Sequence, residues 1–346
     1  MRVRFNQFNR SILTRTCLLT LLCASSAGCV GVVTGQESVV VTRAQMQMGT
    51  LVKITAVAQS EFLAQAAAAA GFTEIRRLEE ILSTWIPTSE LSRVNSSAGE
   101  MPVSVGPETM TVVQGAIQAA KMTDGGFNIA VGPAVEAWNV IEGRRIPTES
   151  ELEAFRPLMD LQAVHVNAQQ RTVFLEKAGM RIDVGGIGKG YAADQAVIMM
   201  KRAGALAGVV ALSGDIKTFG QLPGGKRFPV WIQHPRKEGE ALAFIDLEDE
   251  AISTAGDYER FFERDGVRYH HILDPKTLQP ARSCQSVTVI ARDGIWADGL
   301  DTGIFVMGPE RGMELIERLP NVEAIIIDAN GRLLVSSGLK QRVRFP

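Results

Sequence analysis

Cysteine is scarce in this 346-residue sequence, and most of it lies near the N-terminus. Three of the four cysteines, Cys17, Cys23 and Cys29, fall within or at the end of an N-terminal leader, which leaves Cys284 alone in the rest of the chain. A single cysteine cannot form a disulfide framework, even in an exported protein. The stability of the fold must therefore come from a packed core, which a chain of this length can bury.

Zinc-ligand spacings and an excess of positive charge are also lacking. Of the four histidines, His165 and His234 are isolated, and neither an HExxH motif nor a paired-cysteine spacing occurs, so a zinc enzyme is disfavoured. The formal net charge is −2, and removal of the four arginines in the leader would take it to −6. Nucleic acid, which attracts basic surfaces, is therefore a poor partner for this protein.

The N-terminal segment has the pattern of an export signal. Four arginines precede an apolar stretch over about residues 17–27, which is too short to span a bilayer and ends in small residues. We expect a signal peptide over residues 1–28 and one domain over residues 29–346. The Gly28–Cys29 junction is typical of a lipoprotein, which would be anchored through Cys29 at the periplasmic face of the inner membrane. Cleavage after Ala27 would instead give a soluble exported protein.

Apolar periodicity indicates the main elements of the domain. Two β-rich runs before residue 58 predict a strand pair, and apolar residues at helical spacing predict an amphipathic helix from Glu61 to Leu82. Pro107 and Gly125 mark the start and the end of a second helix. Strands outnumber helices toward the C-terminus. This pattern favours an α+β fold with mainly antiparallel sheets flanked by helices over a doubly wound one.

A glycine-rich stretch, RIDVGGIGKGYAAD, occupies residues 181–194. It is not a P-loop, because Gly190 stands where a metal-binding Ser or Thr must follow Lys189. Nor does it fit a dinucleotide-binding fingerprint, because Tyr191 replaces a small residue. We expect a strand over Met180–Val184 and a helix from Tyr191. The loop amides between them suit an anion, although a tight connection without a ligand is an equal alternative.

A late helix carries oxygen ligands at helical spacing. Asp298 and Thr302 are four residues apart, which places a carboxylate and a hydroxyl on one face of a helix that we expect after Ala297. Mg²⁺ takes a few protein oxygens together with substrate phosphates, so this pair predicts a magnesium site, and Asp301 could approach the same ion. The alternative is a carboxylate that merely favours the N-terminus of its helix.

Two adjacent histidines, His270 and His271, lie in a segment with strand character. Successive side chains of a strand point to opposite faces, so only one of the two can face a given cleft. A histidine there could act as a general base. A hydrogen-bonded histidine within a sheet is the alternative for either one.

Several motifs in fixed order resemble those of the FAD:protein FMN transferases, the ApbE-type flavin transferases. They are MGT from Met48, LSTWIPTSELSRVN from Leu82, GGFNIAVGPAVEAW from Gly125, IDVGGIGKGYAAD from Ile182, LSGD from Leu212, GDYERFF with HILDP, and ADGLDTGIF from Ala297. The resemblance runs from about Met48 to Gly308. It implies a T-fold-like domain that binds FAD and transfers its FMN half to a Thr or Ser hydroxyl of an acceptor flavoprotein, with Mg²⁺ bound and AMP released.

The resemblance also implies roles for individual residues. The expected Mg²⁺ ligands are Asp298, Thr302, the backbone carbonyl of Gly186 and, as a further candidate, Asp301. The expected FAD contacts are Met48, Trp85, Gly126, Phe127, Asn128, Asp183, Lys189 and Ile272. His271 would be the catalytic base, and Lys189 would add positive charge during catalysis.

Four positions depart from the family pattern, and one of them is Ala130, which replaces a Thr. Trp85 stands where Tyr is usual, Asn128 replaces an Asp, and Leu278 replaces a Gly, so we expect a turn of another shape around Leu278. Two other functions fit the same pocket: an FAD pyrophosphatase, with water as the nucleophile, and a lipoprotein that binds FAD without chemistry. The Asp298/Thr302 pair favours an enzyme, because flavin binding alone does not require it.

Overall fold

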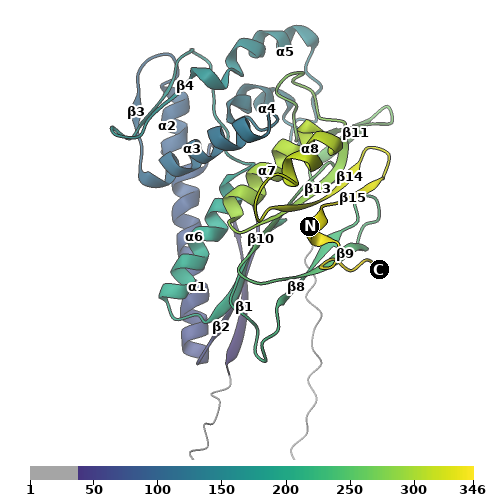
Figure 1. The fold of residues 1–346 in the computed structure, drawn as a ribbon. Coiled ribbons are helices and arrows are strands. Elements are labelled where there is room, and N and C mark those ends of the chain that lie inside the picture. The colour runs from purple at the N-terminus through teal and green to yellow at the C-terminus, as the bar shows by residue number, and fades with distance from the viewer. Residues whose placement is uncertain (1–37) are drawn as a thin grey trace, which may run out of the picture.

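The computed structural model describes residues 38–346 of the chain (Figure 1). The predicted signal peptide and Cys29 lie outside these residues. Within residues 38–346, no helix is long and apolar enough to cross a membrane.

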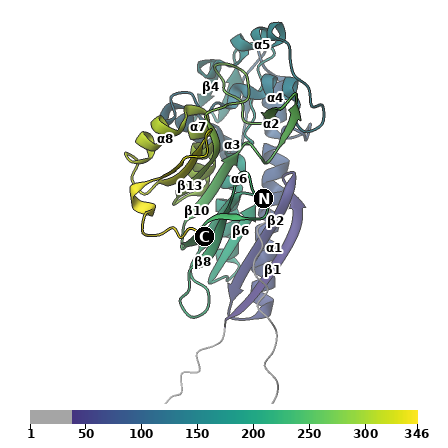
Figure 2. The same cartoon turned by 90° about the vertical axis from the view of Figure 1, so that its right-hand side faces the viewer.

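An eight-stranded sheet forms the centre of the molecule (Figure 2). All of its neighbouring strands are antiparallel, in the order β1-β2-β6-β7-β10-β13-β14-β15. This confirms the predicted α+β class with mainly antiparallel sheets. The strands are β1 (Val39–Gln47), β2 (Thr50–Ala58), β6 (Ala207–Leu212), β7 (Asp215–Phe219), β10 (Ala251–Gly256), β13 (Cys284–Ala291), β14 (Glu323–Asp328) and β15 (Leu333–Val335).

Helices cover one face of this sheet, and a separate hairpin covers the other. Val210 and Leu212 of β6 belong to the core beneath the helices, whereas Val209 packs on the opposite face with the hairpin β8 (Phe228–Gln233) and β9 (Ala241–Leu247). Because β6 is covered on both faces, all of its residues are buried. The helices are α1 (Glu61–Leu82), α2 (Glu90–Ser96), α3 (Pro107–Met122), α4 (Gly132–Trp138), α5 (Glu149–Phe155), α6 (Gly188–Arg202), α7 (Gly294–Met307) and α8 (Pro309–Ile316).

Two smaller sheets complete the fold. One has three antiparallel strands, β3 (Val103–Ser104), β5 (Thr172–Leu175) and β4 (Val164–Asn167). The other is the hairpin β11 (Phe261–Arg264) and β12 (Val267–His270), which ends at the first of the two adjacent histidines.

The predicted strand pair and first helix are confirmed. β1 and β2 pair along their whole length, and Met48 (φ +49°) with Gly49 (φ +67°) forms the two-residue turn between them. Positive φ at both central residues matches the right-handed twist of a hairpin. Helix α1 begins and ends where its periodicity predicts, and the hydroxyl of Ser60 caps it by accepting the N–H of Leu63 (3.3 Å).

The predicted strand over Met180–Val184 is wrong. This segment has no regular secondary structure and joins no sheet. The side chain of Asn95 accepts the N–H of Ile182 (2.8 Å) and donates to its carbonyl (3.0 Å), so it replaces a neighbouring strand. Helix α6 begins at Gly188 rather than Tyr191, and α7 begins at Gly294, ahead of Ala297.

The turn around Leu278 has a backbone conformation that is unusual for leucine. Leu278 has φ +59°, in the left-handed region that glycine favours. Its side chain is buried, and its carbonyl accepts the indole N–H of Trp138 (2.8 Å). We infer that these contacts hold the residue in a conformation that is unfavourable for leucine.

Helices α6 and α7 touch backbone to backbone at two glycines. A Cβ on Gly190 would overlap the carbonyl oxygen of Gly294 and lie 2.8 Å from the Cβ of Asp298, and a Cβ on Gly294 would lie 2.5 Å from the carbonyl oxygen of Gly190. No side chain fits between the two helices there. The close contact brings the start of α6 against the face of α7 that carries Asp298.

Replacement of Gly190 by Ala should therefore lower the free energy of unfolding by about 1–3 kcal/mol, the usual cost of overpacking. Gly188→Ala is the matched control in the same helical turn, because its Cβ would meet only a Val184 methyl at an ordinary 3.5 Å. That variant should be neutral or gain about 0.5–1 kcal/mol from helix propensity. Denaturant unfolding measures both, and equal stability of the two variants would contradict the close contact.

Candidate functional site

Three buried carboxylates meet where β7 and α7 approach each other. Asp298 and Asp301 come from α7, and Asp215 is the first residue of β7. One carboxylate oxygen of each lies within 4.8 Å of those of the other two. All three residues are at most 4 % exposed. We call Asp215, Asp298 and Asp301 the acidic centre.

Each member of the acidic centre has a specific partner. Asp298 Oδ2 accepts the backbone N–H of Gly190 (2.8 Å), in the first turn of α6. Ser253 Oγ, from β10, lies 2.5 Å from Asp215 Oδ1 and 2.6 Å from Asp301 Oδ2. A hydroxyl has one proton and can donate to only one of these carboxylates. The other contact is a hydrogen bond only where that carboxyl group itself holds a proton.

Lys189 is the cation closest to the acidic centre in the described structure. Its ammonium forms an ion pair with Asp215 and lies 3.7 Å from Asp298 Oδ1. Burial opposes the charge of Lys189, but the attraction of Asp215 and Asp298 outweighs it, and the pKa of Lys189 is raised above its usual value. Lys189 is thus held as an ammonium against the carboxylates.

One ammonium does not neutralise three carboxylates. Burial, followed by repulsion from Asp215, raises the pKa of Asp298 to about 7. Burial, followed by repulsion from Asp298 and Asp215, raises the pKa of Asp301 well above its usual range. A carboxyl group whose pKa is raised by burial and like charge is more stable with a bound proton or cation than as an isolated carboxylate. The acidic centre therefore has an excess of negative charge that a divalent cation would balance.

The predicted metal ligands lie together around this centre. Thr302 Oγ1 donates to Asp301 Oδ1 (3.0 Å), and a Cβ on Gly186 would lie 3.2 Å from the same hydroxyl oxygen. The backbone of Gly186 thus lies against Thr302 of α7, and its assignment as a metal ligand stays a prediction. Carboxylate, hydroxyl and carbonyl oxygens are the donors that Mg²⁺ takes from proteins, so the residues present fit this ion.

The helix-terminus explanation of Asp298 does not account for this position. Because α7 begins at Gly294, Asp298 lies in the second turn, whereas the helix dipole acts mainly within the first. Asp298 is also buried against other carboxylates rather than exposed at the helix end. A structural role at the helix terminus would need neither feature.

The predicted GGFN contacts lie directly beside α7. A Cβ on Gly126 would lie 2.5 Å from the carbonyl oxygen of Gly303, and the ring of Phe127 would lie 3.2 Å from a Cβ on Gly186. Phe127 is buried, and its N–H donates to Thr123 Oγ1 (3.0 Å). The glycine loop and the GGFN segment therefore meet at one place, next to Thr302.

Asn128 and Asp183 are hydrogen-bonded within the chain. Asn128 Oδ1 accepts the N–H of Ala130 (2.8 Å), and its amide N–H donates to the carbonyl of Met159 (2.8 Å). An Asp at position 128 could not make the second bond, which gives a physical reason for this departure from the family pattern. Asp183 Oδ1 accepts the N–H of Gly185 (2.7 Å), and burial raises its pKa.

Met48 and Trp85 both lie near the C-terminal end of α1: Met48 contacts that end of the helix, and Trp85 follows it. Met48 occupies the β1–β2 turn, where its N–H donates to Glu79 Oε1 near the end of α1 (2.7 Å). Trp85 follows α1, and its ring is open to solvent because the residue is 82 % exposed. Their assignment as FAD contacts stays a prediction.

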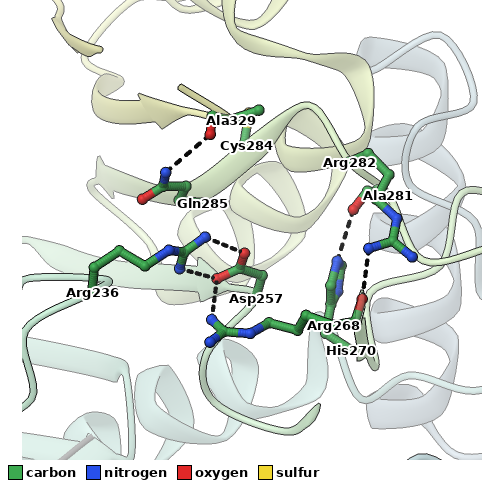
Figure 3. Close-up of a pocket in the computed structure, with 9 residues that line it drawn as sticks. All are labelled: Arg236, Asp257, Arg268, His270, Ala281, Arg282, Cys284, Gln285 and Ala329. Atoms are coloured by element: carbon green, nitrogen blue, oxygen red, sulfur yellow. Dashed lines mark hydrogen bonds and ion pairs between the residues drawn. The ribbon is translucent and has the colours of Figure 1, made fainter. Parts of the chain in front are cut away.

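The two adjacent histidines have different surroundings. His270 is buried, its Nε2 lies 2.7 Å from the carbonyl oxygen of Ala281, and its Nδ1 accepts the N–H of Ile272 (3.3 Å). These bonds assign a neutral tautomer with the proton on Nε2. His270 lines a cavity of about 310 Å³ in which Arg236 and Arg268 converge on Asp257 (Figure 3). His270 is therefore a structural histidine.

His271 lies just beyond β12, and its backbone N–H donates to the carbonyl of Arg260 (3.1 Å). Burial, followed by the positive charge of Arg260, lowers the pKa of its imidazole to about 3, and Lys189 contributes to the same shift. At neutral pH the imidazole of His271 is uncharged and able to accept a proton.

Sequence reasoning missed Asp215 and Ser253. Asp215 ends the LSGD motif that contributed to the family resemblance, but that motif alone does not show that β7 starts beside α7. Ser253 is one serine among many, and only the pairing of β10 with β7 brings its hydroxyl between two carboxylates.

A mainly antiparallel α+β domain that gathers three buried carboxylates, a lysine and a glycine loop at one point has the construction of an enzyme. The sequence model of the ApbE family matches residues 48–326. The chain belongs to this family, as its motifs predicted.

Curated relatives and solved structures agree with this assignment. A protein named FAD:protein FMN transferase from Treponema pallidum is 33% identical over 320 residues, which cover 88% of each chain. One of the same name from Vibrio cholerae is 34% identical over 78% of this chain and 83% of its own length. The crystal structure of the ApbE protein from Thermotoga maritima has a TM-score of 0.82 at 31% identity, covering 88% of this chain and 99% of that one. The structure named flavin transferase ApbE from Vibrio cholerae has a TM-score of 0.78 at 30% identity, covering 88% of this chain and all of that one.

The raised pKa of Asp298 predicts how stability depends on pH without metal. Between the usual carboxyl pKa of 3.8 and about 7, the folded protein holds a proton at Asp298 that the unfolded chain releases, so this group lowers stability as pH rises through that range. Asp298→Asn removes this dependence and keeps an acceptor for Gly190. With EDTA present, the variant should melt above wild type at pH 8 and close to it at pH 4. A variant that melts below wild type at pH 8 would contradict the raised pKa.

Proposed function

We propose that this enzyme transfers the FMN half of FAD to a Thr or Ser hydroxyl of an acceptor flavoprotein, in a Mg²⁺-dependent reaction that forms a phosphoester bond and releases AMP. The acidic centre is the observation that carries the proposal. Its excess negative charge, beside a glycine loop and a lysine, suits a cation that binds a diphosphate. The relatives named FAD:protein FMN transferase support the choice of FAD as the diphosphate.

Asp298, Thr302 and the carbonyl of Gly186 would hold the Mg²⁺, with Asp301 next to them. When bound, the ion would neutralise charge on the diphosphate and stabilise the departing phosphate of AMP. Asp215 holds the ammonium of Lys189 beside Asp298, where it adds a second positive charge for the substrate. Phosphoryl transfer depends on positioning and charge neutralisation, which is what these residues supply.

His271 would accept the proton of the attacking hydroxyl. The hydroxyl oxygen bonds to the FMN-side phosphorus, the bond from that phosphorus to the bridging oxygen breaks, and AMP leaves with the bridging oxygen. The low pKa of His271 keeps the imidazole unprotonated before substrate binds. A bound diphosphate places negative charge nearby, which favours the protonated imidazole and strengthens the base when it is needed.

The decisive experiment is to incubate the enzyme with FAD, Mg²⁺ and a candidate acceptor domain, and then to weigh the acceptor. We expect a mass gain equal to FMN and one AMP per transfer, and no gain with EDTA or with Asp298→Ala. Free FMN and AMP with an unmodified acceptor would show a pyrophosphatase instead, and unchanged FAD would show a binding protein.

Mass spectrometry of the mature enzyme tests the proposed export and lipid anchor. We expect the mature protein to begin at Cys29 and to carry a lipid there.

The role of His271 is tested by His271→Ala. Loss of a general base should slow transfer by about 10²–10⁴-fold while the affinity for FAD changes little. His165→Ala is a suitable control, because His165 is exposed and pairs with Glu176 on the separate β4–β5 sheet. Transfer at the wild-type rate by His271→Ala would remove His271 from the mechanism.

A further inference from the structure

Helix α7, which carries Asp298 and Thr302, is capped by a residue of another helix. Asp194 of α6 accepts the first two backbone N–H groups of α7, from Gly294 (2.8 Å) and Ile295 (3.0 Å). The residue in the N-cap position of α7 itself, Asp293, makes no side-chain cap hydrogen bond. The first two amides of α7 are therefore capped by a carboxylate of α6, which packs beside α7 (Figure 1).

Lys217 holds this carboxylate in place. Its ammonium lies 3.8 Å from Asp194 Oδ1 and donates to the carbonyl of Arg292, just before α7. Lys217 is 8 % exposed, so its charge is largely removed from water and depends on these two partners. It lies two residues after Asp215 on β7, and both side chains therefore point to the same face of the sheet.

The same three elements are thus joined twice. The inner bridge runs from Asp215 of β7 through Lys189 of α6 to Asp298 of α7. The outer bridge runs from Lys217 of β7 through Asp194 of α6 to the first amides of α7. The amides that the outer bridge holds lie about one helical turn before Asp298. A shift of the first turn of α7 would carry Asp298 and Thr302 with it.

The contact between α6 and α7 does not fix this position by itself. Gly190 and Gly294 allow the two backbones to touch, and Asp298 accepts the Gly190 N–H across this contact (2.8 Å), but neither feature holds the first two amides of α7. A hydrogen-bonded carboxylate at the helix end does. Mg²⁺ requires near-octahedral geometry, so a displaced Asp298 would bind it poorly even with every ligand still present.

We propose that Asp194, held by Lys217, is a positioning residue for the metal site: it sets the place of α7 so that Asp298 and Thr302 lie opposite the carbonyl of Gly186. The inference rests on the proposed function, because it takes the acidic centre to be the metal site. Residues that orient metal ligands without touching the ion typically change metal affinity by 10–100-fold when replaced.

Asp194→Asn tests the proposal. The Asn side chain has one oxygen where Asp has two, so it can accept a hydrogen bond from only one of the two α7 N–H groups. Its NH₂ group, which is a donor, then faces either the other N–H or the Lys217 ammonium. We measure binding of Mn²⁺ by the loss of the free ion's EPR signal, and then displace it with Mg²⁺. The affinity should fall by about 10–100-fold, while FAD affinity measured without metal should change little.

Glu90→Gln is the matched control. Glu90 of α2 accepts the N–H of Gly106 (2.8 Å) and the hydroxyl of Thr109 (2.6 Å) at the start of α3, so it caps another helix from outside, away from the acidic centre. This variant should lose thermal stability as Asp194→Asn does and keep wild-type metal affinity. The double variant Asp194→Asn with Lys217→Met removes the unpaired buried ammonium, and should regain stability while metal affinity stays weak.

The outcomes distinguish a failure of the proposed metal site from a failure of the positioning role of Asp194. If the wild-type enzyme binds neither Mn²⁺ nor Mg²⁺, the proposed metal site itself fails. If wild type binds them and Asp194→Asn binds them equally well, only the positioning role is overturned. The same holds if the double variant regains metal affinity together with stability, because Asp194 would then act through general stability alone.

Discussion

The burial of three carboxylates beside one ammonium is the constraint on which the rest of this structure depends. An ionised carboxylate that leaves water loses its hydration, and two further carboxylates nearby repel it. Asp215, Asp298 and Asp301 lie in this position with Lys189 as their close cation. The carboxylates of the acidic centre therefore repel one another, and a hard dication would reduce this repulsion. Under the proposed function, the same charge would select a cation and, through it, a diphosphate.

The fold brings this centre together by allowing backbones to approach closely. Gly190 and Gly294 let α6 touch α7, and Gly126 lies against the carbonyl of Gly303 on another side of the same helix. Carboxylates from one helix, a lysine and an amide from a second, and an aspartate from a strand can then share a small volume. Larger side chains at these glycines would move the ligands apart. The hydrophobic core beneath the helices offsets the loss of stability caused by burying these carboxylates.

The sequence predicted the local features of the molecule better than the contacts across it. Residues close together in the sequence determine three features that the structure confirms: the 3.6-residue period of α1, the β1–β2 hairpin, and the placement of Asp298 and Thr302 four residues apart on one helix. Motif order also identified the family and the fold class. The prediction of a strand around Ile182 was wrong, because the sequence of that stretch does not show that the side chain of Asn95 binds its backbone in place of a neighbouring strand. Asp215, Ser253 and Asp194 act through space, and nothing near them in the chain indicates their partners.

The central claim is that the acidic centre is a cation site built from Asp298, Thr302 and the Gly186 carbonyl. Anomalous X-ray scattering from crystals grown with Mn²⁺, a hard ion that takes the same oxygen ligands as Mg²⁺, tests it most directly. The account predicts one strong anomalous peak bounded by those three groups, with Asp301 beside it. An anomalous map with no peak at the centre, or with Lys189 alone occupying the space between the carboxylates at high Mn²⁺ concentration, would contradict it.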